Sequence, residues 1–170
     1  MSRLRGSLLW LGLLTLASCR IEDHTPTGTR RDEEAVQSIV TRYARTLSDR
    51  DWGAARRLFW PDATYSGPML PTDGDSHQAV PIDLALGVLA RRLEGLDPAR
   101  FDIRILRADY RQEGDLAAVW LVTRRVLPVA GSVAEREWYE HMVLRHIGDE
   151  WRILSLAATP SRRGAVRAQP

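Results

Sequence analysis

Residues 47–64 read LSDRDWGAARRLFWPDAT, and this passage is predicted to run from the end of one helix through a short second helix to a strand. Asp51 is suited to cap a short second helix, because a side-chain oxygen at that position accepts a free backbone N–H. The apolar side of this second helix consists of Trp52, Ala55, Leu58 and Phe59. Pro61 is expected to end the helix, since proline disfavours the helical conformation of the residue before it. A short strand is predicted to follow at 63–66.

A long amphipathic helix is predicted before this passage, over 32–49. Thr29 followed by Asp32 fits a capping pattern at a helix start. The apolar residues then recur at alternating steps of one and three, as one face of a helix requires. They are Ala35, Val36, Ile39, Val40, Tyr43, Ala44 and Leu47.

The remaining chain predicts one more helix and then a sheet. Residues 67–74 are rich in proline and glycine and indicate a loop, and an apolar stripe predicts a third helix that begins near Ser76 or Pro81 and ends near Glu94. After Pro98 the apolar period changes to two, as in strands. Four strands are expected, one starting near 101 and the others near 116–127, 135–147 and 151–159. Gly114-Asp115 and Gly148-Asp149 indicate hairpin turns, so the predicted class is α+β, helices first and then an antiparallel meander.

Composition limits the function classes. The chain has 170 residues, which favours a single domain, here expected over 32–160. All 24 basic residues are arginine, and 22 residues are acidic. Between Asp32 and Pro160 there are 16 arginines and 20 acidic residues, a balance of −4. This balance leaves no basic stripe for phosphates and argues against nucleic-acid binding.

The first 18 residues have the pattern of an export signal. Arg3 and Arg5 precede a short leucine-rich run over 8–16, and small residues follow it. The run is shorter than the roughly 20 apolar residues of a membrane span. Leu16-Ala17-Ser18-Cys19 resembles the lipobox of bacterial lipoproteins, and Cys19 is the only cysteine of the chain.

The lipobox resemblance implies cleavage before Cys19 and lipid attachment to its thiol. Residues 19–31 are then the lipidated N-terminus and a flexible tether, and 161–170 are expected to be a disordered tail. The implied location is the cell envelope, with the protein held on a bacterial membrane by lipid. Arg20 follows the cysteine where an aspartate is the retention signal for the inner membrane in enterobacterial lipoproteins, which slightly favours the outer membrane or the cell surface.

The domain resembles the NTF2-like superfamily, in particular its SnoaL-like polyketide cyclase and ketosteroid isomerase group. The resemblance rests on 47–52, on Leu58-Phe59-Trp60-Pro61-Asp62-Ala63-Thr64, and on the final hairpin over 144–153, where Trp151 follows a glycine turn. It implies a cone, in which three helices wrap a curved sheet around a pocket. The fold alone does not determine function, because isomerases, cyclases, dehydratases and binding modules share it.

Few residues are suited to chemistry in such a pocket. Enzymes of this group place a carboxylate or histidine in an apolar pocket, together with a tyrosine or a protonated acid that stabilises an oxyanion. One face of strand 135–147 carries Tyr139 and His141, and the other carries Trp138 and Glu140. If the first face is internal, His141 is a candidate base that lines the pocket with Tyr65 and Tyr139. The alternative is a polar pair on the outer surface.

No metal or cofactor is expected. His24, His77, His141 and His146 lack the spacing of a convergent ligand set. The chain has no glycine-rich phosphate loop and no serine or cysteine nucleophile motif. Several tryptophans either pack in the core or form an aromatic wall for an apolar ligand or a dimer; they are Trp60, Trp120, Trp138 and Trp151.

Three hypotheses remain open from the sequence. The first is a lipid-anchored, non-catalytic module that binds a small apolar ligand or an envelope partner. The second is an isomerase, cyclase or hydratase acting on a small hydrophobic substrate. The third is a homodimer whose sheet face is the interface, with no open pocket. They differ in what the interior of the cone and the outer face of the sheet contain.

Overall fold

The computed structural model describes residues 29–68, 78–129, 132–161 and 167–169. The predicted signal peptide, Cys19, His24 and His77 lie outside the described residues, as does most of the predicted loop 67–74. No helix among the described residues is both long enough and apolar enough to cross a membrane.

The first helix, α1 (Arg30–Ser48), confirms the predicted capping pattern and apolar stripe, although it begins two residues before and ends one residue before the predicted bounds of 32 and 49. Thr29 and Asp32 form a reciprocal capping box. The Thr29 hydroxyl oxygen accepts from the Asp32 backbone N–H, and the Asp32 carboxylate accepts from the Thr29 hydroxyl. The buried face of α1 consists of Val36, Ile39, Val40, Tyr43, Ala44 and Leu47. The alternating steps along the sequence therefore do correspond to one packed helix face.

The second helix is shorter than predicted. α2 (Trp52–Arg57) is capped by Asp51, whose side chain accepts from the Ala54 N–H, as expected. It ends before Phe59, because Phe59 already belongs to strand β1 (Phe59–Ser66). Pro61 therefore lies inside β1 and does not end the helix. The pairing of β1 with its neighbour is irregular between Phe59 and Thr64, which accommodates a residue without an N–H.

The third helix begins at the later of the two predicted positions. Pro81 precedes α3 (Ile82–Leu93), and a two-residue strand, β2 (Val80–Pro81), pairs with β1. A 3₁₀ turn, η1 (Pro98–Arg100), then leads into the sheet. The buried side of α3 consists of Ile82, Ala85, Leu86, Leu89 and Leu93.

The four predicted strands form an antiparallel meander. They are β3 (Asp102–Glu113), β4 (Leu116–Val129), β5 (Ser132–Ile147) and β6 (Glu150–Pro160). Gly114 and Gly148 occupy the predicted turns with positive φ values of 56° and 64°. β1 adds in parallel beside β6, so the strand order is β2-β1-β6-β5-β4-β3. The sheet is mixed but mainly antiparallel, and the predicted α+β class is confirmed.

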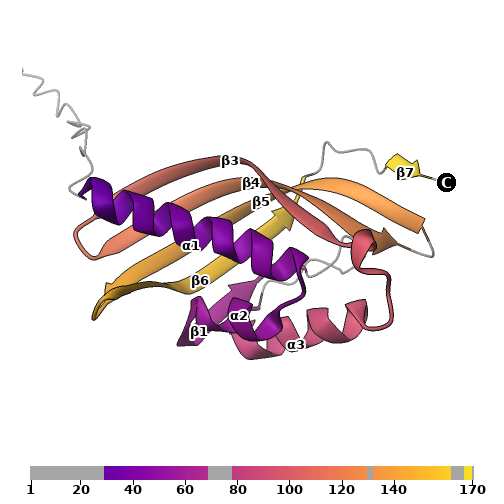
Figure 1. The fold of residues 1–170 in the computed structure, drawn as a ribbon, viewed down its shortest axis with the longest axis horizontal. Helices are drawn as coiled ribbons and strands as arrows, with labels where there is room; N and C mark the ends of the chain where they lie inside the picture. Colours follow the sequence, from indigo (N-terminus) through magenta and orange to yellow (C-terminus); the bar gives the residue numbers. More distant parts are fainter. Residues whose placement is uncertain (1–28, 69–77, 130–131, 162–166, 170) are drawn as a thin grey trace, which may run out of the picture.

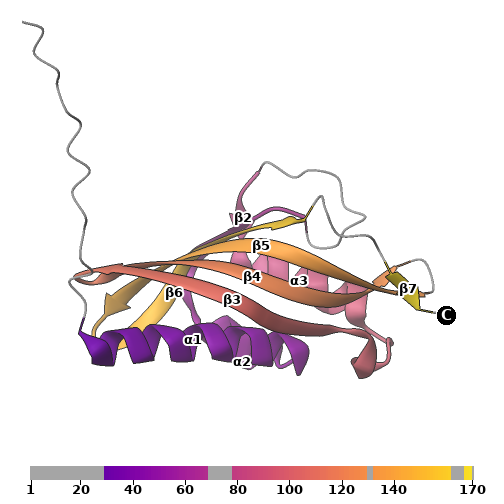
Figure 2. The same ribbon diagram turned by 90° about the horizontal axis from the view of Figure 1, so that it is seen from above.

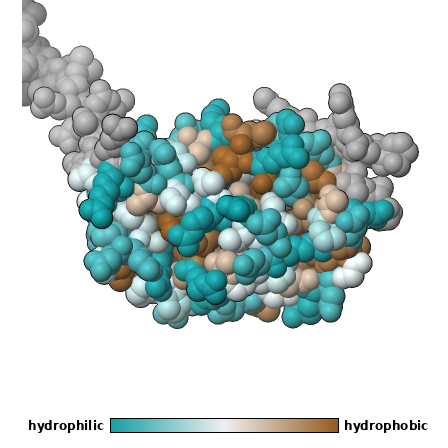
Figure 3. Space-filling view, in the orientation of Figure 1, coloured by the Kyte–Doolittle hydropathy of each residue, from teal (hydrophilic) through white to brown (hydrophobic). Residues whose placement is uncertain are grey.

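The helices cover one face of a curved sheet. Figures 1 and 2 show α1 running across the sheet on one side, with α2 and α3 near the end formed by β1. Seen from the α1 side, the surface is mainly hydrophilic, with isolated hydrophobic areas (Figure 3). The core lies between the helices and the sheet and includes Leu58, Phe59, Trp138 and Leu144. This is the layer in which an internal site has to lie.

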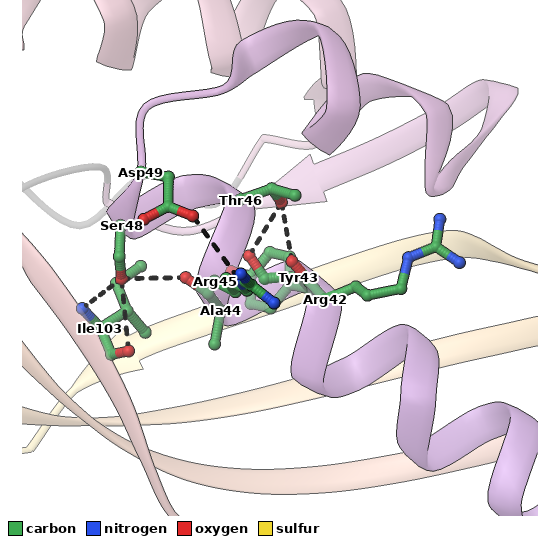
Figure 4. Close-up of polar contacts among 8 residues, drawn as sticks. All are labelled: Arg42, Tyr43, Ala44, Arg45, Thr46, Ser48, Asp49 and Ile103. Carbon is green, nitrogen blue, oxygen red and sulfur yellow. Dashed lines mark hydrogen bonds and ion pairs between the residues drawn. The ribbon is translucent and has the colours of Figure 1, made fainter.

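The C-terminal end of α1 is bonded to the sheet through Ser48 (Figure 4). Its hydroxyl donates to the Ala44 carbonyl at 2.9 Å and accepts from the Ile103 N–H of β3 at 2.9 Å. Thr46 similarly donates back to the carbonyls of Arg42 and Tyr43. These bonds fix the position of the end of α1 relative to β3. Because Tyr43 lies near that end of α1, they also fix the distance between Tyr43 and the sheet.

The tail prediction needs one correction. Ser161 is buried, and its N–H donates to the Glu137 carbonyl at 2.8 Å. Arg167–Gln169 form a short strand, β7, which pairs with the start of β5. The polar composition of 161–170 gives no sign of this pairing, because the hydrogen bonds between paired strands are made by the backbone and need no particular side chains.

Among the glycines that the structure describes, Gly67 is the one at which a side chain is least tolerable. Its φ is +123°, and a Cβ built there would lie 2.0 Å from the Ala158 carbonyl oxygen. We expect Gly67→Ala to lower the free energy of unfolding by about 3 kcal/mol, through both strain and the clash. Urea denaturation measures this change.

Gly114→Ala is the matched control, because Gly114 also has positive φ but no atom within 4 Å of the added Cβ. It should cost only about 1 kcal/mol, the strain alone. Equal losses in the two variants would show that the contact with Ala158 is unimportant.

Candidate functional site

Glu140 determines which face of β5 is internal. Trp138, Glu140, Met142 and Leu144 alternate along the strand, and each is at most 1% exposed. The helices therefore cover this face, and the face that carries Tyr139 and His141 points away from them. The choice that the sequence leaves open is settled by four consecutive inward positions.

The Glu140 carboxylate joins three elements of the domain. One oxygen accepts from the Tyr43 hydroxyl of α1 at 2.9 Å and lies 3.0 Å from the Arg125 guanidinium of β4. The other oxygen accepts a short hydrogen bond from the Thr123 hydroxyl, also on β4. All four residues are buried, with exposures between 0% and 5%. We call Tyr43, Thr123, Arg125 and Glu140 the interior cluster.

Arg125 also stacks on an aromatic ring. Its guanidinium carbon lies 4.4 Å from the centroid of the Trp138 ring, which places the cation over the negative face of the indole. Among the described residues, the Nε and Nη2 groups of Arg125 have no hydrogen-bond acceptor, although Nη2 is within ion-pair distance of Glu140. The attraction between Nη2 and the carboxylate is therefore mainly electrostatic rather than a well-aligned hydrogen bond.

The protonation states follow from burial and from the pairing. Burial, together with the nearby Glu140 carboxylate, raises the pKa of Tyr43 well above its ordinary value, so its hydroxyl stays protonated and donates. Burial disfavours the charged form of Arg125, but Glu140 outweighs this effect and raises the pKa of Arg125. Arg125 is thus a permanent cation held against a carboxylate.

Of the residues predicted to line the pocket, Tyr65 alone belongs near this cluster. It is 5% exposed, and its phenol adds to the raised pKa values of both Tyr43 and Arg125. Its hydroxyl donates to the Pro68 carbonyl at 2.6 Å. Trp60 is half-buried, and the guanidinium of Arg152, which lies outside the cluster, is 6.0 Å from its ring centroid.

The structure corrects the placement of His141 and Tyr139. Both lie on the outer face of the sheet, Tyr139 is 45% exposed, and the His141 ring stacks on Trp120 with centroids 4.2 Å apart. Neither side chain meets Tyr65 inside the cone. The reason is the two-residue period of a strand, since burying Glu140 turns both of its neighbours outward. His141 therefore has no geometric basis as a base in the interior.

The sequence reasoning missed most of the interior cluster. The sequence places Tyr43 in the apolar stripe of α1, where its ring does pack, and it places Thr123 and Arg125 in the predicted strand 116–127 without a role of their own. One signal was present, because the odd positions of β4 from 117 to 127 are apolar except at Thr123 and Arg125. Two polar residues on an otherwise buried face indicate a buried partner for them.

The interior cluster is a set of paired groups rather than an open ligand set. Among the described residues no three of His, Cys, Asp or Glu come close enough to hold a metal ion. The carboxylate already interacts with Tyr43, Thr123 and Arg125. A general base needs a lone pair directed at the substrate proton, and this carboxylate directs its lone pairs at the protein itself.

Comparison with solved structures identifies the fold. An NTF2-like protein with a cystatin-like fold from Novosphingobium aromaticivorans is 18% identical, with a TM-score of 0.61 over 79% of this chain and 85% of that chain. A ketosteroid isomerase-like protein from Erwinia carotovora atroseptica is 18% identical, with a TM-score of 0.59 over 78% and 98%. The CaMKII hub of S. rosetta is 14% identical, with a TM-score of 0.62 over 81% and 100%.

These likenesses show that the described domain has the NTF2-like, cystatin-like fold, as the resemblance in the sequence implied. No family model matches the chain, and no curated protein matches it. At such identities the likeness extends to the fold and not to the activity of the similar proteins.

The interior cluster predicts an asymmetric response to substitution. Glu140→Ala leaves Arg125 buried without a counter-charge and should lower the free energy of unfolding by about 3–5 kcal/mol. Replacing both partners, as Glu140→Leu with Arg125→Met, should recover much of this loss. Urea denaturation of the two variants gives both values.

Glu135→Ala is the matched control, because its ion pair with Arg124 is 3.2 Å long but both side chains are 44–45% exposed. Its cost should stay within about 1 kcal/mol. A similar small cost for Glu140→Ala would contradict the structural role assigned to the cluster.

Proposed function

We propose that the protein is a membrane-anchored bacterial lipoprotein whose NTF2-like domain acts by binding, without catalysis, to a small apolar ligand or to a partner in the cell envelope. The anchor is lipid on Cys19, and the location is the envelope, with the outer membrane or the cell surface favoured. The observation that carries the non-catalytic part is the engaged carboxylate of Glu140.

The interior chemistry supports binding over catalysis. The isomerase, cyclase or hydratase alternative needs an acid or base that can reach a substrate in the cone. Glu140 is the buried carboxylate among the described residues, and three side chains of the protein already interact with it. The histidine considered for this task, His141, lies on the outer face. A binding role needs neither group to be free.

The anchoring part rests on the sequence. Leu16-Ala17-Ser18-Cys19 matches the lipobox at all four positions, after a charged start and a leucine-rich run. Nine residues lie between Cys19 and Thr29, where the capping box begins the folded domain. Acyl chains contribute about 0.8 kcal/mol for each buried CH₂, so two or three chains hold a protein firmly on a bilayer.

Replacing the sole cysteine tests the anchor. Cys19→Ser should remove the acyl mass from the protein, because no other thiol can be acylated. The variant should then either leave the membrane fraction for the soluble fraction or keep the mass of its uncleaved signal peptide. Fractionation and intact mass spectrometry measure both effects. Ser18→Ala is the control, since it keeps a small residue beside the cysteine and should leave acylation unchanged. Unchanged acyl mass in Cys19→Ser would reject the proposed anchor.

The exposed aromatic face of the sheet favours a second candidate, a homodimer through that face. Trp120 is 57% exposed and Tyr139 is 45% exposed. Trp120 pairs with His141 across β4 and β5, and Val122 pairs with Tyr139, so Trp120 and Tyr139 are diagonal neighbours on the two strands. Tryptophan and tyrosine dominate the binding energy of many interfaces. In this arrangement the domain would bind a second copy of itself as well as the membrane through its lipid.

A charge placed on this face tests the homodimer. Trp120→Arg should shift the protein, purified in detergent, from dimer to monomer by at least about tenfold in dissociation constant, because a buried unpaired charge opposes the contact. Leu84→Arg on α3 is the control, since Leu84 is comparably exposed at 51% but lies on a helix. Native mass spectrometry reports the two masses. A monomeric wild-type protein would exclude this candidate.

A further inference from the structure

A groove of about 760 Å³ lies outside the interior cluster, between α1, α2 and the hairpin that joins β5 to β6. Its volume is in the range of small-molecule sites, about 300–1,000 Å³. α1 contributes Arg31, Ile39 and Arg42, α2 and its end contribute Arg57 and Leu58, and Trp151 comes from β6.

The cationic groups of the groove are unpaired, whereas two of its three carboxylates are engaged. Within the described residues no carboxylate lies at ion-pair distance from Arg31, Arg42 or Arg57. By contrast, the Asp32 carboxylate accepts the Thr29 hydroxyl at 2.6 Å, and Glu150 pairs with Arg152 at 2.9 Å. The lining holds three arginines and three carboxylates, and what distinguishes the arginines is that their guanidinium groups have no ion-pair partner among the described residues.

The charges are separated along the groove. Asp32, Asp149 and Glu150 lie at the end formed by the start of α1 and the β5–β6 turn. Arg57 lies at the end of α2 next to Leu58, whose carbonyl accepts the Ile153 N–H at 2.9 Å. Arg42 follows Arg31 by eleven residues, or about 16 Å along the helix axis, so it lies toward the C-terminal end of α1. An anion is therefore favoured beside Arg42, with Arg57 of α2, rather than beside Arg31, which adjoins Asp32 in the chain.

The floor of the groove is apolar and contains one unpaired donor. Ile39, Leu58 and Trp151 are 9%, 1% and 4% exposed. The indole N–H of Trp151 is buried, and among the described residues no acceptor meets hydrogen-bond geometry with it. The Asp32 carboxylate lies close enough for this indole to contribute to the lowered pKa of Asp32, for which the Thr29 hydroxyl is the main cause. A ligand oxygen at the floor of the groove would give this donor a well-aligned acceptor.

We propose that this groove is a binding site for a small amphipathic anion, a phosphate or carboxylate on an apolar frame. The guanidinium groups of Arg42 and Arg57 hold the anionic group, the apolar part lies on Ile39 and Leu58, and an oxygen of the ligand accepts from the Trp151 indole. The site lies on the outside of the cone and needs neither the lipid on Cys19 nor an open interior. It therefore goes beyond the proposed function and stands or falls separately from it.

Octyl phosphate is a suitable probe, because it joins a short apolar chain to a phosphate. We expect calorimetric titration of the protein expressed from the full chain, held in phosphatidylcholine nanodiscs if it carries lipid and in buffer if it does not, to show saturable binding of octyl phosphate. Octanol and inorganic phosphate should each bind at least tenfold more weakly, since each offers only half of the contacts. If either binds as tightly as octyl phosphate, the amphipathic assignment is wrong. Empty nanodiscs provide the partition background.

Matched variants locate the site. Arg42→Gln with Arg57→Gln should weaken octyl phosphate binding by ten- to a hundredfold. Arg45→Gln with Arg100→Gln removes the same charge from exposed positions outside the groove and should change binding less than twofold. The two double variants should unfold at similar urea concentrations, since all four side chains are exposed. Absent saturable binding in the wild type, or equal loss in both double variants, overturns the proposal.

Discussion

The ion pair between Glu140 and Arg125 is the interaction on which the rest of the domain depends. Moving a carboxylate and a guanidinium out of water costs several kcal/mol for each, and only close pairing with further hydrogen bonds offsets this cost. Tyr43 and Thr123 supply those bonds from α1 and β4. The residues that form the core are therefore constrained to bring one helix and two strands to a single carboxylate.

This constraint decides what the sheet presents on each side. Once Glu140 is internal, the alternation of the strand sends Tyr139 and His141 outward, and the register places Trp120 opposite His141. The exposed aromatic face is thus a consequence of the interior pair and not a separate feature. The same register aligns Thr123 with Trp138, so that Arg125, two residues further along β4, reaches the Trp138 ring. Interior and outer face are determined together.

Local signals explain how much of this could be predicted from the sequence. Thr29 with Asp32, Asp51, and the turns at Gly114 and Gly148 act over a few residues, and each was located correctly. Phe59 was assigned to a helix because its apolar character suits either element, and only its pairing beside Ile153 of β6 makes it a strand residue. A preference of a few tenths of a kcal/mol is readily outweighed by such tertiary contacts.

The site was harder to predict because its members are distant in the chain. Tyr43 and Glu140 are 97 residues apart, and nothing local to either of them indicates the other. The sequence of strand β5 alternates between two faces, one with Glu140 and the other with His141. Each face contains a polar residue, so the number of apolar residues on each does not show which face is buried. The distinguishing information was in β4, where Thr123 and Arg125 interrupt an apolar face and need a buried acceptor.

A domain that uses its interior charges for its own stability has to interact with other molecules through its exterior. Opening the interior cluster to a ligand would expose Arg125 or Glu140 to partial loss of its partner, at a cost comparable to the whole stability of a small domain. The exterior carries no such penalty, because the arginines of the groove and the aromatic residues on the outer face are already solvated. Binding there gains attraction without breaking a buried pair, which favours exterior recognition in this NTF2-like domain.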